Sequence, residues 1–121
     1  MTTAQTAAQQ TVLDTALGYF SAWTARNIDE AMTFVADDVV FDAPFGRSEG
    51  ATSLRKALEE FMEIFKGAEI VDAFADEHSA AILYMTQTSL ASDLPACEYL
   101  GVENGKVNYK RLIFDRLPFG E

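Results

Sequence analysis

Residues 19–44 read YFSAWTARNIDEAMTFVADDVVFDAP, and this stretch connects a helical half of the chain to a strand half. It begins inside a run from Ala7 to Thr24 whose apolar residues recur at helical spacing, which predicts a helix. Asn27-Ile-Asp-Glu30 has the pattern of an N-cap with a glutamate three positions later, so a short second helix is expected through Phe34. Val39 to Pro44 predicts a strand that ends at the proline or lies at a sheet edge, because proline has no N–H to donate.

The rest of the chain predicts one more helix and four more strands. Thr52 to Phe65 carries apolar residues on one face and charges on the other, which indicates an amphipathic helix. Phe45 to Gly50 is expected to be a loop, and Gly18 is expected to permit a close approach to the first helix by the sheet. Strands are predicted at 69–75, 80–88, 97–102 and 106–115, with an Asn-Gly hairpin turn before the last. The resulting order, α-α-β-α-β-β-β-β, indicates an α+β domain.

Two of the predicted strands carry apolar residues on both faces. Ile82 and Leu83 point to opposite sides of one strand, as do Ile113 and Phe114 of another. A sheet with one solvated face alternates between apolar and polar residues, so both faces of this sheet are expected to be covered. The helices can cover one face, and a second copy of the chain is the best cover for the other. We therefore predict a homodimer through the outer sheet face; the alternative is that the strands are merely rich in apolar residues.

Composition excludes several functions without selecting one. The chain has 121 residues, 49% of them hydrophobic, and 9 Lys and Arg against 19 Asp and Glu give a net charge of −10. This length suits a single domain with one core. The acidic balance argues against nucleic-acid binding and against attachment to anionic membranes, because both depend on clusters of Lys and Arg.

The cysteine content and the N-terminal sequence predict a cytoplasmic location. Cys97 has no second cysteine with which to form an internal disulfide. No basic residue precedes Arg26 and no apolar segment follows the initial Met, so a secretory signal is not expected. No apolar run approaches the ~20 residues of a membrane span. Residues 1–6 are expected to form a disordered tail, and residues 7–121 a single domain.

The order of elements and the sequence of residues 19–44 together resemble the nuclear transport factor 2-like superfamily. In that superfamily an aromatic helix end and a short connector lead to Ala-Asp-Asp-Val, here residues 36–39, and then to a strand ending in proline. Glu103–Val107 and Phe114-Asp115 resemble its closing hairpin, most closely in the SnoaL-like branch. The resemblance implies a cystatin-like cone, in which three N-terminal helices pack on a curved, mostly antiparallel sheet around a pocket. Isomerases, cyclases, epoxide hydrolases, dehydratases and non-enzymes share this fold, so the fold does not specify the chemistry.

The ketosteroid isomerase pattern of this superfamily combines an aspartate base with a tyrosine and a protonated acid as donors. Its tyrosine corresponds to Tyr19, for which a plain core role is the alternative. Its buried acid falls on or beside Glu98, which is expected to be protonated if it is dry, or else to reach water at a strand edge. Its base position holds Ala43, and the adjacent Asp42 faces the pocket only if a bulge redirects it. Otherwise Asp42 is expected to be solvated or to cap the following turn.

Other branches of the superfamily match this sequence less well. Cyclases of the SnoaL type use a pocket histidine, but His78 lies in a polar turn and is expected at the surface. Epoxide hydrolases of this fold place an arginine between two aspartates, and Leu112 occupies the position of the second aspartate. Lys110 shares a strand face with Leu112, so it is expected either to point inward as a cation for an anionic ligand or to extend to the rim.

The residue pattern therefore favours an apolar pocket with a few polar groups. Small-molecule sites have this composition. We expect an acid/base isomerase, cyclase or hydrolase acting on a hydrophobic ring compound; the alternatives are a non-catalytic small-molecule binder and a protein-interaction module. No metal-binding or phosphate-binding motif is present, so no cofactor is expected. Tyr19, Asp42 and Glu98 are the catalytic candidates, and the candidate wall residues are Trp23, Phe45, Phe61, Phe65, Tyr84 and Lys110.

Overall fold

The computed structural model describes residues 6–119. Its first helix, α1, runs from Ala7 to Thr24 as predicted, and Thr6 caps it: the Thr6 hydroxyl accepts from the Gln9 backbone N–H, and the Gln9 side chain accepts from the Thr6 N–H. Thr6 thus belongs to the helix start rather than to the expected tail of residues 1–6, whose other members lie outside the described residues. Within residues 6–119, no helix combines the length and the apolar character of a membrane span.

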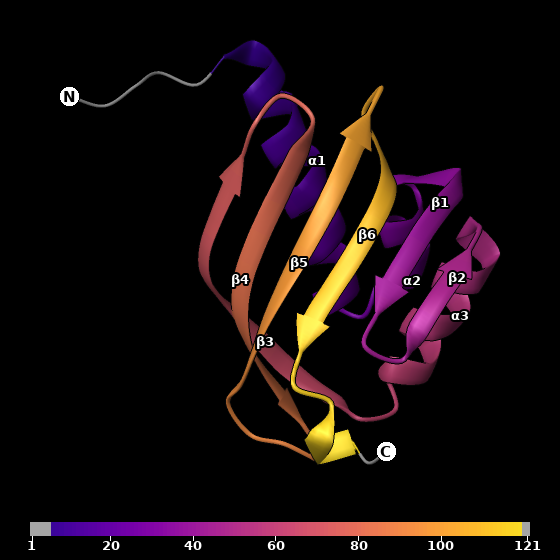
Figure 1. Ribbon diagram of the computed structural model, residues 1–121, viewed down its shortest axis with the longest axis vertical. Coiled ribbons are helices and arrows are strands. Elements are labelled where there is room, and N and C mark those ends of the chain that lie inside the picture. Colours follow the sequence, from indigo (N-terminus) through magenta and orange to yellow (C-terminus); the bar gives the residue numbers. More distant parts are fainter. Residues whose placement is uncertain (1–5, 120–121) are drawn as a thin grey trace.

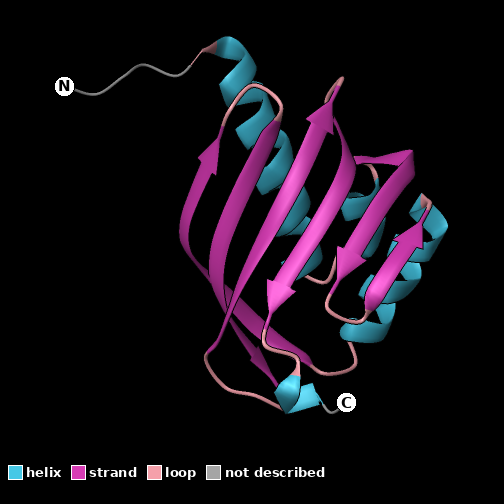
Figure 2. Ribbon diagram, viewed as in Figure 1, coloured by secondary structure: helices cyan, strands magenta, loops and turns pink. Residues whose placement is uncertain are grey.

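Two further helices complete the helical layer. Helix α2 spans Ile28–Met32 and begins at Asn27, whose side chain accepts from the Glu30 backbone N–H as the sequence predicts. Helix α3 spans Ala51–Phe61. Helix α1 packs across the strands of one end of the sheet, and α3 packs against the strands of the opposite end of the sheet. All three helices lie on the same face of the sheet (Figure 1 and Figure 2).

Six strands form one curved sheet in the order β2-β1-β6-β5-β4-β3. Among the described strands, the β1–β6 pair is parallel and the other four pairs are antiparallel, so the sheet is mostly antiparallel, as expected. The strands run β1 Val35–Ala43, β2 Gly46–Glu49, β3 Phe65–Ala75, β4 Ser79–Thr88, β5 Leu94–Glu103 and β6 Lys106–Phe114. A 3₁₀ turn, η1, follows at Leu117–Phe119. The α+β class and the arrangement of three helices on a curved sheet are confirmed.

The boundaries of some elements differ from the prediction. The segment expected as a loop contains the short strand β2, which extends the sheet by pairing with β1. Helix α3 ends four residues before Phe65, which instead begins β3 opposite Thr88. The buried Phe65 is compatible with the end of an amphipathic helix and with the start of a strand, because the last apolar position of the helix and the first inward position of the strand both face the core.

Gly18 permits a close approach, but by a side chain from the α2–β1 connection rather than by the sheet. A Cβ built on Gly18 would lie 2.7 Å from the ring of Phe34. This contact packs the α2–β1 connection against α1. The buried core then extends from α1 to the inner face of the sheet, and the outer sheet face carries no helix from residues 6–119 (Figure 1).

Candidate functional site

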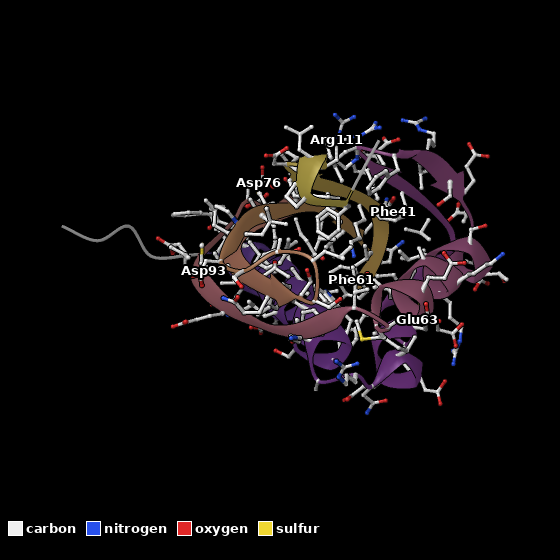
Figure 3. The ribbon with its side chains drawn as sticks, turned by 90° about the horizontal axis from the view of Figure 1, so that it is seen from below. Phe41, Phe61, Glu63, Asp76, Asp93 and Arg111 are labelled. Atoms are coloured by element: carbon white, nitrogen blue, oxygen red, sulfur yellow. The ribbon has the colours of Figure 1, made fainter. Side chains whose placement is uncertain are left out.

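A cavity of about 600 Å³ lies between the helices and the inner face of the sheet. Its walls are mainly aromatic and aliphatic side chains from α1, α3 and strands β1, β4, β5 and β6. Figure 3 shows Phe41 and Phe61 inside the curved sheet and Arg111 on its outer side. The volume is in the range of small-molecule sites.

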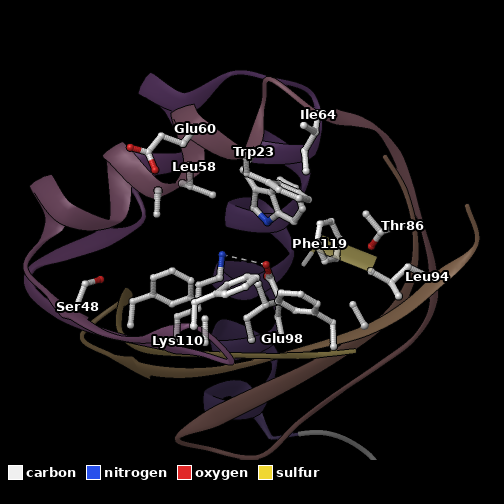
Figure 4. Close-up of a pocket in the computed structure, with 18 of the residues that line it drawn as sticks. Trp23, Ser48, Leu58, Glu60, Ile64, Thr86, Leu94, Glu98, Lys110 and Phe119 are labelled. Carbon is white, nitrogen blue, oxygen red and sulfur yellow. Dashed lines mark ion pairs between the residues drawn. The ribbon is translucent and has the colours of Figure 1, made fainter. Parts of the chain in front are cut away.

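Glu98 and Lys110 form an ion pair on the cavity wall. The Lys110 Nζ atom lies 3.0 Å from Glu98 Oε1, and the two side chains are 3% and 0% exposed (Figure 4). Glu98 is on β5 and Lys110 on β6, where they are diagonal neighbours because Glu98 pairs with Leu112 and Leu100 pairs with Lys110. Of the two positions expected for Lys110, the structure shows the inward one.

A one-residue irregularity between β5 and β6 places these two side chains on the same face. Starting from the hairpin turn, Glu103 pairs with Lys106 and Val102 with Val107, but Gly101 then pairs with Tyr109 and leaves Asn108 unpaired. Without this shift, the regular register would put Glu98 and Lys110 on opposite faces. Gly101 accommodates the irregularity, since a Cβ there would lie 2.8 Å from Asn108 Oδ1.

Tyr19, on α1, accepts a hydrogen bond from the Lys110 ammonium. The Lys110 Nζ donates a hydrogen bond of 2.9 Å to the Tyr19 hydroxyl, and both residues are buried. Tyr19 itself does not line the cavity, so its expected role as a direct donor to a ligand is corrected: it positions Lys110 instead. Burial raises the pKa of Tyr19 to about 12 against the lowering effect of Lys110, so its hydroxyl stays protonated at neutral pH.

Lys110 remains charged despite its burial. Desolvation lowers the pKa of Lys110, but the Glu98 carboxylate and the Tyr19 hydroxyl raise it, and the net direction is upward. The ammonium also lies 5.0 Å from the ring centre of Tyr19, 5.4 Å from Trp23 and 5.3 Å from Phe41, within the range of cation–π attraction.

Asp42 does not belong to this site. It pairs with Arg111 on the outer face of the sheet, whereas its neighbours Phe41 and Ala43 line the cavity. Its carboxylate accepts two hydrogen bonds of 2.8 Å from Arg47 and one of 2.6 Å from the Tyr109 hydroxyl. These hydrogen bonds, with Arg47 contributing most, hold the pKa of Asp42 well below its usual range. The prediction that Asp42 is a pocket base is therefore wrong, because the strand alternates regularly here and no bulge turns the side chain inward.

The aromatic candidates divide into wall, mouth and core residues. Trp23, Phe61 and Tyr84 line the cavity, and Phe45, 59% exposed, lies at its mouth. Phe65 does not line it; its ring packs against Trp23 and Phe61 from the core side. The sequence reasoning missed the inward-facing Thr86 and the two rings of Phe114 and Phe119, which pack edge to face with their centres 5.3 Å apart. Regular alternation along β4 and β6 could have indicated that Thr86 and Phe114 face inward. No local sequence pattern indicates the position of Phe119.

The remaining titratable residues offer no metal site. His78 is exposed in the turn after β3, as expected, where its backbone N–H donates to Asp76. Among the described residues, no group of three His, Cys, Asp or Glu side chains is placed to hold a metal ion. The polar groups available to a ligand are therefore those of the cavity wall.

Comparisons with known proteins agree with this architecture. The profile of a family described as SnoaL-like domain matches residues 16–109. A crystal structure of a protein from Kribbella flavida DSM 17836 is 43% identical, with 91% of each chain covered and a TM-score of 0.87. Among curated proteins there is no match.

Two more distant structures share the fold. An NTF2-like protein of unknown function from Cytophaga hutchinsonii ATCC 33406 is 21% identical over 100% of each chain, with a TM-score of 0.81. An LEH-like epoxide hydrolase from M. tuberculosis is 16% identical over 91% of this chain and 86% of its own, with a TM-score of 0.77. At these identities the likeness extends to the fold alone.

Proposed function

Because the chain belongs to the family of SnoaL-like domains, we propose that its cavity is an acid/base site for a hydrophobic ring compound. One observation carries this proposal: a charged Glu98–Lys110 pair, fully buried, forms part of the wall of an otherwise apolar cavity. A buried ion pair is often no more stabilising than apolar residues of the same volume. Its presence on a cavity wall therefore supports a role toward a ligand.

The geometry supports a distinct role for each polar residue. Glu98 is the proton acceptor, because its carboxyl group lies on the cavity wall, 3.0 Å from the Lys110 ammonium. Lys110 stabilises negative charge that develops on a ligand oxygen, and Tyr19 fixes Lys110 from behind. Proton transfer by a positioned side chain contributes typically 10²–10⁴-fold to a rate and needs no metal. Isomerisation, cyclisation and hydrolysis all use such a step.

A thermal-shift screen followed by a turnover assay tests this proposal. Neutral ring compounds that raise the melting temperature are incubated with the protein in deuterated water, and mass spectrometry detects conversion or the exchange of carbon-bound hydrogen. A ligand at 100 times its dissociation constant adds about 2.7 kcal/mol to the stability, so weak binders register. We expect conversion to fall at least 10²-fold in Glu98→Gln at matched occupancy. Equal conversion by the wild type and this variant would contradict the proposal.

A non-catalytic binder is the second candidate, and the position of Asp42 favours it. The carboxylate nearest the family's base position faces away from the cavity, and Ala43 lines the cavity in its place. Screening hits that bind the wild type without any conversion or exchange would identify this function. The third alternative, a protein-interaction module, calls for a filled interior, which the cavity of about 600 Å³ disfavours.

The proposal includes a homodimer through the outer sheet face and a cytoplasmic location. Leu83, Tyr99 and Ile113 project from the three adjacent strands β4, β5 and β6, and they are 41%, 41% and 54% exposed. A two-fold axis over these strands would pair the same patch on both copies. Sedimentation at micromolar concentration is expected to give twice the chain mass, and a compact monomer would exclude the dimer. The free thiol of Cys97 suits a reducing compartment.

A further inference from the structure

The buried side chains that lack hydrogen-bond partners all face the same cavity. Within residues 6–119, the buried side-chain nitrogen and oxygen atoms without such a partner are Trp23 Nε1, Thr86 Oγ1 and both carboxylate oxygens of Glu98. All three residues line the cavity, and each is at most 3% exposed. Glu98 has Lys110 beside it as a counter-charge, but neither carboxylate oxygen accepts a hydrogen bond of normal geometry.

Unpartnered buried polar groups are rare in folded proteins, because each has lost its water without gaining a replacement. If such groups occurred at random, they would be distributed throughout the core. Their concentration on one cavity wall indicates that a molecule in the cavity supplies the partners. The types of these groups then restrict the chemistry of that molecule.

Trp23 and Glu98 require opposite hydrogen-bonding partners. The Trp23 indole N–H only donates, and the Glu98 carboxylate only accepts. In Figure 4 the indole nitrogen points toward the Glu98–Lys110 pair, so a ligand group in the space between them would face both residues. A hydroxyl oxygen accepts from the indole and donates its own hydrogen to the carboxylate. A ketone oxygen has no hydrogen for Glu98, and a ligand carboxylate would repel it.

The charges of the cavity favour a neutral ligand. Glu98 and Lys110 cancel within the wall, and the other charged residues of the lining, Glu60 and Arg47, are exposed and also of opposite sign. A ligand with a net charge would therefore lose its hydration without gaining an uncompensated partner.

We propose that the cavity binds a neutral, hydroxyl-bearing hydrophobic molecule whose hydroxyl accepts from Trp23 and donates to Glu98. This inference rests on the proposed function and names its substrate class: the group that presents its proton to Glu98 is an O–H. Trp23 and Lys110 then lie on the side of the oxygen where negative charge develops as the proton leaves.

Four probes that share one apolar skeleton test the inference. They are 1-adamantanol, 2-adamantanone, adamantane-1-carboxylate and 1-adamantylamine, and calorimetric titration gives a dissociation constant for each. We expect the alcohol to bind about tenfold more tightly than the ketone, which corresponds to about one additional hydrogen bond. The carboxylate and the ammonium compound are expected to bind more weakly than either.

Two variants locate the hydroxyl. Trp23→Phe keeps an aromatic ring but removes the N–H. We expect it to weaken binding of the alcohol and of the ketone alike, because both oxygens accept from the indole, while the preference for the alcohol, which comes from donation to Glu98, remains. Thr86→Val removes the other unpartnered donor while keeping the side-chain shape. Weaker alcohol binding in Thr86→Val together with unchanged alcohol binding in Trp23→Phe would place the hydroxyl elsewhere and overturn the assignment.

The wild-type protein provides a test that does not depend on a variant folding. Trp23 is the only tryptophan, so its indole N–H gives a single side-chain signal in a ¹H–¹⁵N spectrum. The alcohol is expected to shift this proton downfield as it becomes hydrogen-bonded, and an unchanged signal on saturation would refute the contact. Probes that bind without preference for the alcohol overturn the hydroxyl inference alone. If no probe binds at millimolar concentration, both this inference and the ligand site of the proposed function fail.

Discussion

The Glu98–Lys110 pair yields the sharpest energetic prediction. Lys110→Met removes the ammonium and leaves the Glu98 carboxylate buried, 0% exposed, without the counter-charge that lies 3.0 Å away in the wild type. Glu98→Leu has the reverse effect and leaves an unpaired ammonium. The double variant replaces both charges with apolar side chains of similar size.

The three variants should differ strongly in stability. Removing one partner of a buried pair costs about 3–5 kcal/mol, because the remaining charge has neither water nor a counter-ion. Replacing both partners with apolar residues is often neutral, or stabilising by about 1–4 kcal/mol. Each single variant is therefore expected to be at least about 3 kcal/mol less stable than the double variant, and the double variant at least as stable as the wild type.

Urea unfolding followed by circular dichroism measures these free energies for all four proteins. Equal m-values across the set would show that the variants unfold from equally compact states. If Lys110→Met lowers the free energy of unfolding by less than about 1 kcal/mol, or if the double variant is no more stable than the single variants, the description of a desolvated charge pair is wrong.

Three further predictions concern the surroundings of the pair. Wild-type stability should fall as the pH rises from 10 to 12, because tyrosine in the unfolded chain ionises near pH 10 whereas burial raises the pKa of Tyr19 to about 12; Tyr19→Phe should remove about 2 kcal/mol of that loss, and an identical decline in both proteins would contradict it. The Asp42 pKa is lowered in the fold, so Asp42→Asn should be less stable than the wild type at pH 7, with the difference shrinking progressively as the pH falls from about 4 toward the lowered pKa of the folded state in acid unfolding curves; altered 1-adamantanol binding would place Asp42 back in the site. Gly101→Val should destabilise the protein by about 1–3 kcal/mol in urea, because its side chain collides with Asn108 and Tyr109; an unaffected variant would show that the strand irregularity does not depend on this glycine.

Sequence patterns were sufficient for the architecture. The apolar periodicity of α1, the Asn27 cap and the Asn-Gly turn each depend on neighbouring residues, and the structure contains all three. The short strand β2 was missed because Gly46–Glu49 has no apolar alternation and gains its hydrogen bonds only by pairing with β1. Its place in the sheet is set by tertiary contact, which overrides weak local preference.

The site was harder to predict because it depends on strand register. Glu98 could be placed inward from alternation along its own strand, and Asp42 could be suspected of facing outward for the same reason. The pairing of Glu98 with Lys110 could not be predicted this way. Counting back from the hairpin turn places the two side chains on opposite faces, and only the unpaired Asn108 reverses this result. The sequence signal for this change of register is a single glycine, Gly101, and a glycine within a strand has many other possible structural causes.

The ionisation state of Glu98 at neutral pH tests the central claim most directly. Glutamate labelled with ¹³C at the side-chain carboxyl gives a resonance whose position separates the charged from the protonated form, and the Glu98→Gln variant identifies the signal. We expect the charged position at pH 7, because the Glu98 carboxyl group lies 3.0 Å from the Lys110 ammonium. A resonance at the protonated position would contradict the charged pair and would leave Glu98 as a hydrogen-bond donor in the cavity.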